Sequence, residues 1–384
     1  MSTRLKKTKR IARSTRPAAW PCALISLVLA ALFAASCARQ TPPPKPYVAF
    51  AADEANDSLV AVNMANFRIV ASIPVAHGPA RVVARPRSHQ LYVVSASGRI
   101  SVLNFPELRV SKTLPVGERA SDLAFSPDGR RAFALEPNAG EVVFIDCEAM
   151  KEAGRVNLDT PLSGLALTPD GATLVVAAAG QGRLVFVDAE SRKVLGSAEV
   201  GKTPGPLAIL PDSSKVFVAD SEADQVSAVD VASRQMLANL ETGSRPSSLL
   251  LKPDGGELFV FSDTGSTLTF VDAFHNNISQ TMTTGREPAA AIIRRDGSVL
   301  YIATAGDGSV SALDVENRLP LAVAHVGTEP RALALTPDER FLAVADSAAG
   351  ALAILRTDHN TLVTTVPVGA RPVDVIVPDW LWEK

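Results

Sequence analysis

The chain has 384 residues, of which 47% are hydrophobic and only 5% aromatic, so Val, Ala and Leu must supply most of the core. Its formal net charge is −2, but residues 1–36 carry seven Lys and Arg side chains and no acid, so the remainder is distinctly acidic. An acidic body argues against nucleic acid as a partner, because phosphate contacts need clustered cations.

Residues 1–36 have the pattern of a bacterial export signal. A basic segment precedes an apolar stretch that starts at Ala18 and runs into Ala34-Ala35-Ser36-Cys37. These last four residues resemble the lipobox of bacterial lipoproteins, in which the signal is cut before the Cys and the thiol receives a diacylglycerol. The resemblance implies that Cys37 is lipidated and anchors the protein in a membrane. An uncut signal anchor, or ordinary cleavage near Ala35, are the alternatives.

Residues 37–46 predict a tether between this anchor and a folded domain. Four of them are Pro, which favours an extended polyproline II segment with a reach of roughly 28 Å. Ala38 follows the Cys, and by resemblance to lipoproteins of bacteria with two membranes it favours the outer membrane. We therefore expect an exported protein, lipid-anchored to the cell envelope on the periplasmic side of the outer membrane.

Residues 47–378 are built from a repeat. The segment VGERASDLAFSPDG from Val116 recurs as VGKTPGPLAILPDS from Val200 and as VGTEPRALALTPDE from Val326. Aligned on the Gly, the copies are spaced by 42 residues, at positions 117, 159, 201, 243, 285, 327 and 369, with Asp in place of Gly at 159. A less regular copy starts at Ala76. A fixed spacing of this length indicates a repeat architecture.

Each repeat reads as four strands. A short apolar run such as residues 165–167 leads into a Pro-Asp-Gly turn, then into an apolar strand such as residues 215–219. An alternating strand that ends in Asp follows, such as residues 225–230, and then a fourth strand such as residues 194–200. Four antiparallel strands in about 42 residues predict an all-β fold of propeller blades, which must stack in a ring to bury both faces.

The two ends of the repeat region complement each other. Residues 47–50, 58–62 and 69–73 match strands two, three and four, whereas residues 373–377 supply only a first strand. Joined, the N- and C-terminal strands would form one composite blade that closes the ring. Seven complete units and this composite blade predict a single propeller of eight blades, with a seven-bladed ring as the alternative.

These segments resemble the YVTN family of bacterial and archaeal β-propeller repeats. The matching segments are VGTEP at 326–330, PDG at 127–129, LYVV at 91–94 and VFVD at 185–188. The resemblance covers residues 47–378 and implies the propeller fold. It implies no single function, because such propellers act as binding scaffolds, as surface proteins and as enzymes or enzyme subunits, lactonase-like and quinoprotein-dehydrogenase-like ones among them.

Motifs that would indicate catalysis, a metal or a cofactor do not stand out. The sequence has no nucleophile elbow, zinc motif, P-loop or dinucleotide fingerprint, and Cys147 is its only Cys after Cys37. The acidic loops at residues 53–57 and 220–224 lack the central Gly and late Glu of a calcium loop. The five His residues fall at different places in the repeat: His77, His89, His275, His325 and His359. We therefore predict no catalytic residue, no metal and no cofactor.

One charged cluster is predicted at the central channel. The position that begins the innermost strand is small or neutral in most copies, but in three neighbouring blades it is Arg81, Asp122 or Asp374. An Arg between two Asp at the channel mouth fits a site for a small polar ligand. The interpretation that we favour is an ion pair that secures the closing blade.

The loops before the innermost strands predict a charged face. They carry Arg119, Lys202, Arg245, Arg286, Arg331 and Arg371. The loops between strands two and three are expected on the same face, with the acids Asp53, Glu136, Asp220, Glu222 and Asp307. A rim of mixed charge is typical of a protein-recognition surface, although any solvated face carries some charge.

Residues 379–384 form a C-terminal tail with two of the three Trp residues, expected either to pack against the closing blade or to contact a partner. Together, the sequence favours a binding scaffold in the cell envelope, whose partner is another envelope protein or a small polar ligand. A propeller enzyme and a structural envelope protein are the alternatives.

Overall fold

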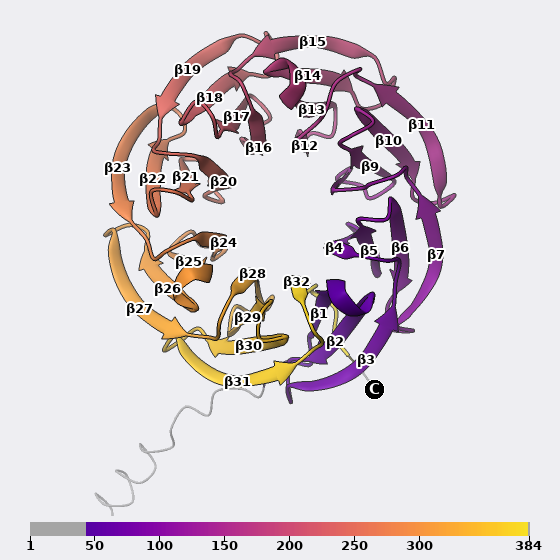
Figure 1. Cartoon of the computed structure of the whole chain (residues 1–384), viewed down its shortest axis with the longest axis vertical. Helices are drawn as coiled ribbons and strands as arrows, with labels where there is room; N and C mark the ends of the chain where they lie inside the picture. Colours follow the sequence, from indigo (N-terminus) through magenta and orange to yellow (C-terminus); the bar gives the residue numbers. More distant parts are fainter. Residues whose placement is uncertain (1–43, 383–384) are drawn as a thin grey trace, which may run out of the picture. The chain divides into compact units, whose positions relative to one another are not determined.

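The computed structural model describes residues 44–382 as a ring of eight four-stranded antiparallel sheets (Figure 1). The prediction of an all-β, eight-bladed propeller is therefore confirmed, and the seven-bladed alternative is wrong. The expected export signal, Cys37 and most of the tether lie outside the described residues. Within residues 44–382, no helix is long and apolar enough to cross a membrane.

The strands of each blade run from the central channel to the outer rim. The inner strands are β4 (Pro79–Ala84), β8 (Asp122–Phe125), β12 (Gly164–Leu167), β16 (Pro204–Ile209), β20 (Pro246–Leu251), β24 (Pro288–Ile293), β28 (Pro330–Leu335) and β32 (Pro372–Ile376). The second strands are β1 (Val48–Asp53), β5 (Gln90–Ser95), β9 (Arg131–Glu136), β13 (Thr173–Ala178), β17 (Lys215–Asp220), β21 (Glu257–Ser262), β25 (Val299–Thr304) and β29 (Phe341–Asp346).

The outer half of each blade follows the same order. The third strands are β2 (Ser58–Asn63), β6 (Arg99–Asn104), β10 (Glu141–Asp146), β14 (Arg183–Asp188), β18 (Gln225–Asp230), β22 (Thr267–Asp272), β26 (Ser309–Asp314) and β30 (Ala351–Arg356). The outer strands are β3 (Arg68–Pro74), β7 (Arg109–Pro115), β11 (Lys151–Asn157), β15 (Val194–Glu199), β19 (Met236–Glu241), β23 (Asn277–Thr283), β27 (Leu319–His325) and β31 (Thr361–Pro367). Three short 3-10 helices join second to third strands: η1 (Glu54–Asn56), η2 (Ala179–Gln181) and η3 (Ala305–Asp307).

The core lies between neighbouring blades, at the level of the second and third strands. Strands such as β17 and β29 are buried along their whole length, because a central strand of a stacked blade has a neighbouring sheet on each face. This explains their continuous Val, Ala and Phe sequences. The outer strands alternate or are largely exposed. Small Ala and Val side chains suit the narrow space between blades, so few aromatic residues are needed.

The ring is closed as the sequence predicts. β32 pairs with β1 in antiparallel register, with Ala51 opposite Val375, so the last strand becomes the inner strand of the first blade. The C-terminal tail extends this closure, since Leu381 forms a β-bridge with Tyr47. Trp380 is buried in the same apolar cluster as Phe50 and Phe105 of the adjoining blades. The tail is therefore packed against the closing blade, which was one of its two interpretations.

A buried carboxylate holds the loop that leads into the inner strand, here called the lead-in loop. In one blade, Asp346 at the end of β29 accepts hydrogen bonds from the backbone N–H groups of Thr328 (2.6 Å) and Glu329 (2.9 Å). The same arrangement occurs with Asp53, Glu136 and Asp220 in their own blades. All four acids are buried. An ionised carboxylate is stable there only because hydrogen bonds replace its hydration, so this carboxylate clamp joins the two innermost strands of the blade.

The clamp accounts for four of the six Gly residues that recur every 42 residues, namely Gly117, Gly201, Gly327 and Gly369. A Cβ atom added to Gly327 would lie 1.6 Å from Oδ2 of Asp346. In the other three clamps, a Cβ atom added to the Gly would lie 1.7–1.8 Å from a carboxylate oxygen of the clamp acid. The Gly therefore makes room for a carboxylate. Where the anchor is Asp159, the second strand ends in Ala178, so no carboxylate stands in that place. In those four blades Gly and clamp acid are two halves of one interaction, whereas the strands opposite Gly243 and Gly285 end in Ser262 and Thr304.

We expect Gly327→Ala to lower the free energy of unfolding by about 1–3 kcal/mol, because the added methyl group overlaps a buried carboxylate that has no room to move. Gly205→Ala is the matched control on β16, since its Cβ would meet nothing closer than 3.7 Å. Denaturant unfolding followed by circular dichroism measures both. Equal stability of the two variants would show that the clamp does not set the need for Gly.

Candidate functional site

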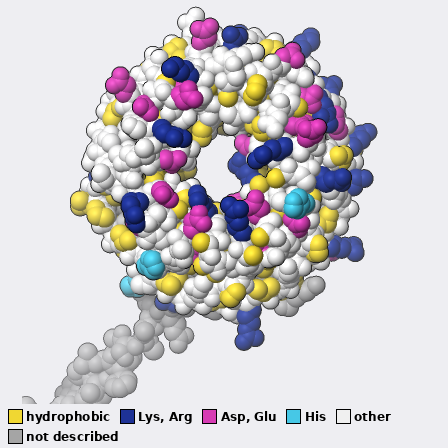
Figure 2. Space-filling view, viewed as in Figure 1, with side chains coloured by type: hydrophobic (Ala, Val, Ile, Leu, Met, Phe, Trp, Pro, Cys, Tyr) yellow, Lys and Arg dark blue, Asp and Glu magenta, His cyan; other side chains and the backbone are white. Residues whose placement is uncertain are grey.

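The lead-in loops and the loops between second and third strands meet on one face of the ring, around the mouth of the central channel. Figure 2 shows this face, with Lys, Arg, Asp and Glu side chains gathered around an open centre. We call this region the channel mouth. Its wall is formed by the eight inner strands.

The structure brings the predicted cluster of Arg81, Asp122 and Asp374 together. Nη1 of Arg81 donates a hydrogen bond to Oδ1 of Asp122 and forms an ion pair that links β4 to β8. Asp374 on β32 accepts the backbone N–H of Val82 at 2.7 Å. The Asp374 contact crosses the junction between the closing blade and the blade of β4, and the Arg81 contact crosses the next junction, between the blades of β4 and β8. They fit the interpretation of a latch, and the half-exposed Arg81 still reaches solvent at the channel mouth.

The pKa of Asp374 is raised above the ordinary value of an aspartate. Burial raises its pKa to about 6, while the N–H of Val82, the nearby Arg81 guanidinium and the N–H of Val375 oppose the shift. A carboxylate with this pKa changes its charge within a physiological range of pH. Arg81, which pairs with Asp122, therefore lies beside a carboxyl group whose charge changes in mild acid.

The six cations predicted for the lead-in loops divide into two groups, and one of them, Arg331, lies on the inner strand β28 instead of in its loop. Arg286, Arg331 and Arg371 form ion pairs with the neighbouring acids Asp307, Glu329 and Glu54. Arg119, Lys202 and Arg245 are exposed and form no ion pair within residues 44–382. The mouth therefore carries three positive charges that are available to a ligand or partner.

Five acids were predicted to lie exposed on the rim, and for three of them this prediction is wrong. Asp53, Glu136 and Asp220 are buried clamp residues and offer no charge to a partner. Glu222 is exposed as expected, and Asp307 pairs with Arg286 at 2.8 Å. The sequence pattern missed the difference because all of these acids stand where a strand passes into a loop. Only the closing of the loop over the strand end decides which one is covered.

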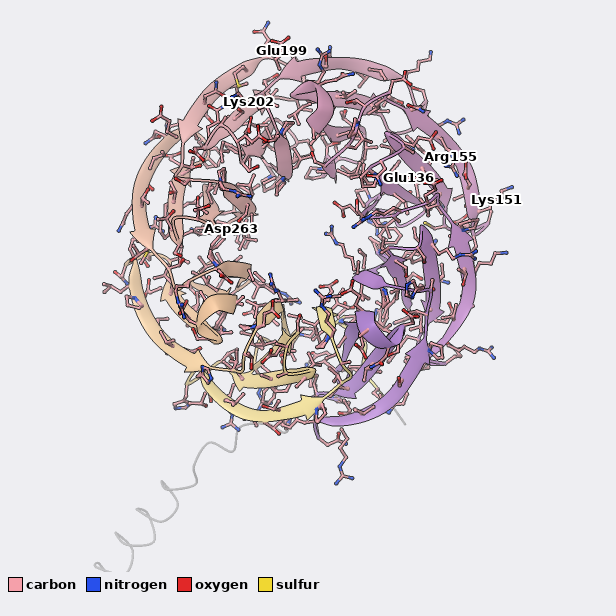
Figure 3. All side chains as sticks on the ribbon, viewed as in Figure 1. Glu136, Lys151, Arg155, Glu199, Lys202 and Asp263 are labelled. Carbon is pink, nitrogen blue, oxygen red and sulfur yellow. The ribbon has the colours of Figure 1, made fainter. Side chains whose placement is uncertain are left out.

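A pocket of about 380 Å³ opens at the channel mouth between β20, β24 and β28, and it was not predicted. Two carboxylates, a guanidinium and two hydroxyl groups line it: Asp263, Glu287, Arg331, Ser247 and Ser248. Figure 3 shows Asp263 at the inner edge of its blade, toward the channel, in contrast to Glu199 at the outer rim. Of these residues, only Arg331 was singled out from the sequence.

The pocket residues are held in different ways. Oδ1 of Asp263 accepts a hydrogen bond from the hydroxyl of Ser247 at 2.5 Å. Arg331 donates to Oε1 of Glu329 through Nε and Nη2, which leaves its other N–H groups for a ligand. Glu287 is exposed, and its side chain has no hydrogen-bond partner among the described residues. Asp263 is thus positioned, and Glu287 is the carboxylate that is available for proton transfer.

One sequence signal could have found this pocket. Asp263 stands one position after the clamp position, which in its own blade holds Ser262. The acid in that blade is therefore not needed for the clamp. A search for acids that miss the clamp register would have separated Asp263 from its buried counterparts.

Histidine contributes one polar pair to the mouth. Nδ1 of His77 lies 2.9 Å from Oδ2 of Asp57, and Oδ1 of Asp57 accepts the N–H of Gly78. Hydrogen bonding between the two side chains raises the pKa of His77, and the N–H of Gly78 is the largest cause of the lowered pKa of Asp57. The pair is solvent-exposed and forms part of no described pocket. Within residues 44–382, no cluster of three His, Cys, Asp or Glu side chains is arranged to hold a metal ion.

Comparison with known proteins places this architecture. The family described as "Lactonase, 7-bladed beta-propeller" matches residues 90–373, well over half of the chain. No curated protein matches the chain.

Among solved structures, dihydro-heme d1 dehydrogenase NirN in complex with DHE superposes with a TM-score of 0.77 at 14% identity, covering 88% of this chain and 76% of that chain. A functionally unknown protein from Desulfotomaculum acetoxidans gives 0.61 at 16% identity, covering 76% and 99%. Hydrazine synthase of Kuenenia stuttgartiensis gives 0.53 at 20% identity, covering 67% and 89%. At these identities the likeness concerns the fold alone.

Asp374→Asn should flatten the dependence of thermal stability on pH between pH 4 and 7. The folded-state pKa lies above the ordinary value, so the protonated carboxyl stabilises the fold below about pH 4, and this contribution is lost as the pH rises through about 6. Melting temperatures across this range measure the effect. Asp379→Asn, at an exposed acid, is the control. The test is the slope of melting temperature against pH. The melting temperature itself is not diagnostic, because an Asn side chain has one oxygen and cannot accept the N–H groups of Val82 and Val375 as the two carboxylate oxygens do. Parallel curves for the native protein and the Asp374→Asn variant would contradict the shift.

Proposed function

The chain belongs to the family described as "Lactonase, 7-bladed beta-propeller", and from this premise we propose that it hydrolyses a small lactone in the pocket at the channel mouth. The observation that carries the proposal is the lining of that pocket, which combines two carboxylates with a guanidinium. Ester hydrolysis requires a base to activate water and a positive group near the carbonyl oxygen. The pocket offers both residue types in one enclosure.

The mechanism assigns one role to each group. Glu287 accepts a proton from a water molecule, whose oxygen forms a new bond to the lactone carbonyl carbon. Arg331 stabilises the negative charge that develops on the carbonyl oxygen. The bond between the carbonyl carbon and the ring oxygen then breaks, and Glu287 returns the proton to that oxygen. The product is an open-chain hydroxy acid, and no other reactant is consumed.

Asp263 and Ser247 act as positioning groups in this proposal. Their mutual hydrogen bond fixes the pocket wall on β20, so the substrate is oriented by a rigid edge rather than by a loop. The volume of about 380 Å³ admits a small-molecule substrate and excludes a large one. The adjoining cation Arg245, which precedes β20, would draw an anionic substrate toward the mouth.

A haem-type ligand has weaker support from the residues. The NirN structure contains such a fold in complex with DHE, and a haem iron needs a His, Met, Cys or Tyr ligand. The eight inner strands contain none of these residues. His77 is on a lead-in loop and is engaged with Asp57. A tetrapyrrole therefore has no part in the proposed mechanism.

The sequence favours a binding scaffold because it predicts a charged rim. Three acids of that predicted rim are buried in the clamps and are not exposed to a partner. The enzyme alternative gains support from the family match and from the mouth pocket. The two are separated by activity: a scaffold shows none toward lactones.

Purified protein should release acid from one or more γ- or δ-lactones in a pH-stat assay. Glu287→Gln should lower kcat by roughly 10²–10⁴, the usual contribution of a general base. Glu199→Gln on the outer strand β15 is the matched control and should retain full activity. The proposal is wrong if Glu287→Gln hydrolyses lactones at the native rate, or if the native protein hydrolyses none of the γ- and δ-lactones tested.

We also propose that Cys37 is lipidated and holds the protein at the envelope, on the lipobox-like sequence and the Pro-rich segment that follows it. Cys37→Ser should then move the protein from the membrane fraction to the soluble fraction, which cell fractionation and mass spectrometry of the N-terminus measure. A variant that stays in the membrane fraction would indicate an uncut signal anchor instead.

A further inference from the structure

A second pocket lies where the two ends of the chain meet, at the opposite end of the inner strands from the channel mouth. Its volume is about 470 Å³, and it is lined by the turn between β4 and β5 and by residues that follow β32. The lining includes Arg85, Arg87, Ser88, His89, Asp379 and Trp380. It shares no residue with the mouth pocket, so it is a separate site.

The turn that forms this pocket departs from the repeat in charge. The corresponding position is acidic in all seven other blades: Asp128, Asp170, Asp212, Asp254, Asp296, Asp338 and Asp379. In this blade it is Arg87. Several of the acids organise their own turn, as Asp128 does by accepting hydrogen bonds from Ser126 and from the N–H of Arg130. The fold therefore favours Asp at this position, and the reversed charge calls for another explanation.

Three consecutive donors face this pocket without partners of their own. The side chains of Arg87, Ser88 and His89 make no hydrogen bond or ion pair within the described part of the chain. Arg87 also holds a left-handed backbone conformation, with φ at 56°, which is uncommon for a long side chain. Guanidinium, hydroxyl and imidazole groups side by side match the several acceptor oxygens of a phosphate group.

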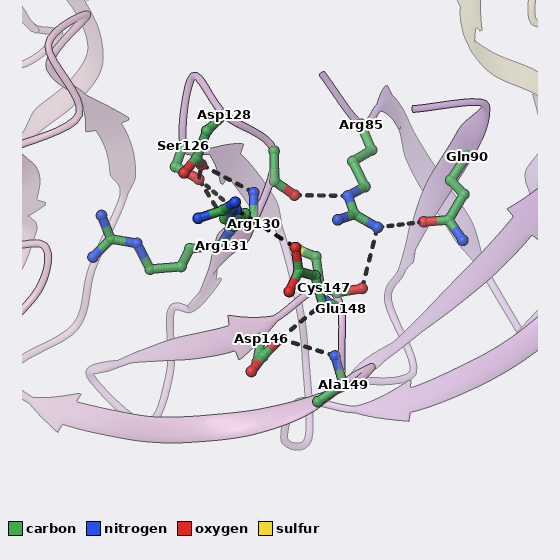
Figure 4. Close-up of polar contacts among 11 residues, drawn as sticks. Arg85, Gln90, Ser126, Asp128, Arg130, Arg131, Asp146, Cys147, Glu148 and Ala149 are labelled. Atoms are coloured by element: carbon green, nitrogen blue, oxygen red, sulfur yellow. Dashed lines mark hydrogen bonds and ion pairs between the residues drawn. The ribbon is translucent and has the colours of Figure 1, made fainter. Parts of the chain in front are cut away.

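The pocket wall is rigid on both sides. Nε of Arg85 donates to the carbonyl oxygen of Gly129 at 2.6 Å, and Nη1 donates to that of Cys147 at 3.2 Å, which ties the turn to the next blade (Figure 4). On the other side, the rings of His89 and Trp380 pack edge to face, with centroids 5.3 Å apart. Arg85 is thus a structural cation, whereas Arg87 is free for a ligand.

We propose that this pocket binds a phosphate group, with Arg87, Ser88 and His89 as its donors and the Trp380 ring as the wall beside the group that carries the phosphate. The phosphate can belong to a small metabolite or to a membrane lipid, and the chemistry of recognition is the same for both. Binding would bridge the first complete blade and the C-terminal tail, and so would tighten the closure of the ring.

Asp379 gives the proposal a test of opposite sign. It is the one acid in the lining, and its charge opposes a bound anion. Asp379→Asn should therefore tighten binding severalfold, whereas Arg87→Asp should weaken it about tenfold or more. Asp is among the residues that adopt a left-handed backbone conformation most readily, so the turn is expected to tolerate Arg87→Asp. Arg130→Asp, on the same face in the next blade and 71% exposed, is the matched control.

The experiment titrates the full-length protein, purified in detergent, with glycerol 3-phosphate at constant ionic strength. Trp fluorescence reports binding, because Trp380 and Trp382 are two of the three Trp residues. A second arm uses detergent micelles with and without phosphatidylglycerol.

A saturable response to glycerol 3-phosphate that Arg87→Asp removes supports the proposal with a soluble phosphate ester as ligand. A response only to phosphatidylglycerol, again removed by Arg87→Asp, supports it with a lipid headgroup as ligand. No saturable response in either arm, or equal affinity of the native protein and the Arg87→Asp variant, overturns it.

Discussion

The hydrogen bonds between a buried carboxylate and the lead-in loop are the constraint on which the rest of the ring depends. Each inner strand of a propeller has only one partner in its sheet, and its far edge faces the channel. It needs a second attachment, and in four of the eight blades the clamp supplies one by fixing the loop just before the strand. Asp346 does so with two N–H groups, and Asp220 receives as many as four backbone N–H groups. These bonds hold the inner strands in place, and with them the channel mouth.

The clamp also decides which charges are left for function. A carboxylate that is covered by its own loop cannot meet a substrate, so the acids in clamp register belong to the fold. Asp263 misses that register by one position and lies in the mouth pocket instead. Arg87 likewise stands where the other turns have an acid. In a repeat protein, the residues that the fold does not need are those that differ from the repeat, and each proposed site contains such a residue, Asp263 in one and Arg87 in the other.

The fold could be predicted from the sequence because its determinants are local and periodic. The spacing of 42 residues indicated the blade, and the missing first strand before Tyr47 together with the extra strand at Val373 indicated the closure. The sites could not be predicted in the same way. The pocket of Asp263, Glu287 and Arg331 draws on three different blades, and nothing in the repeat states which side chains meet across a blade junction. Burial of Asp53 and Asp220 was missed for a related reason, because a strand-end acid looks solvated until its loop folds over it.

The closing blade also orients the two faces of the molecule. Within β1, Asp53 lies at the channel mouth, where it holds Ala370 and Arg371. The other end of the strand follows Pro46, whose carbonyl oxygen accepts the N–H of Trp382. Six residues of extended strand separate these ends by about 20 Å. The described chain therefore begins and finishes on the side remote from the mouth. The strand pair that completes the ring therefore runs from the face of the channel mouth, which holds one proposed site, to the opposite face, which holds the other.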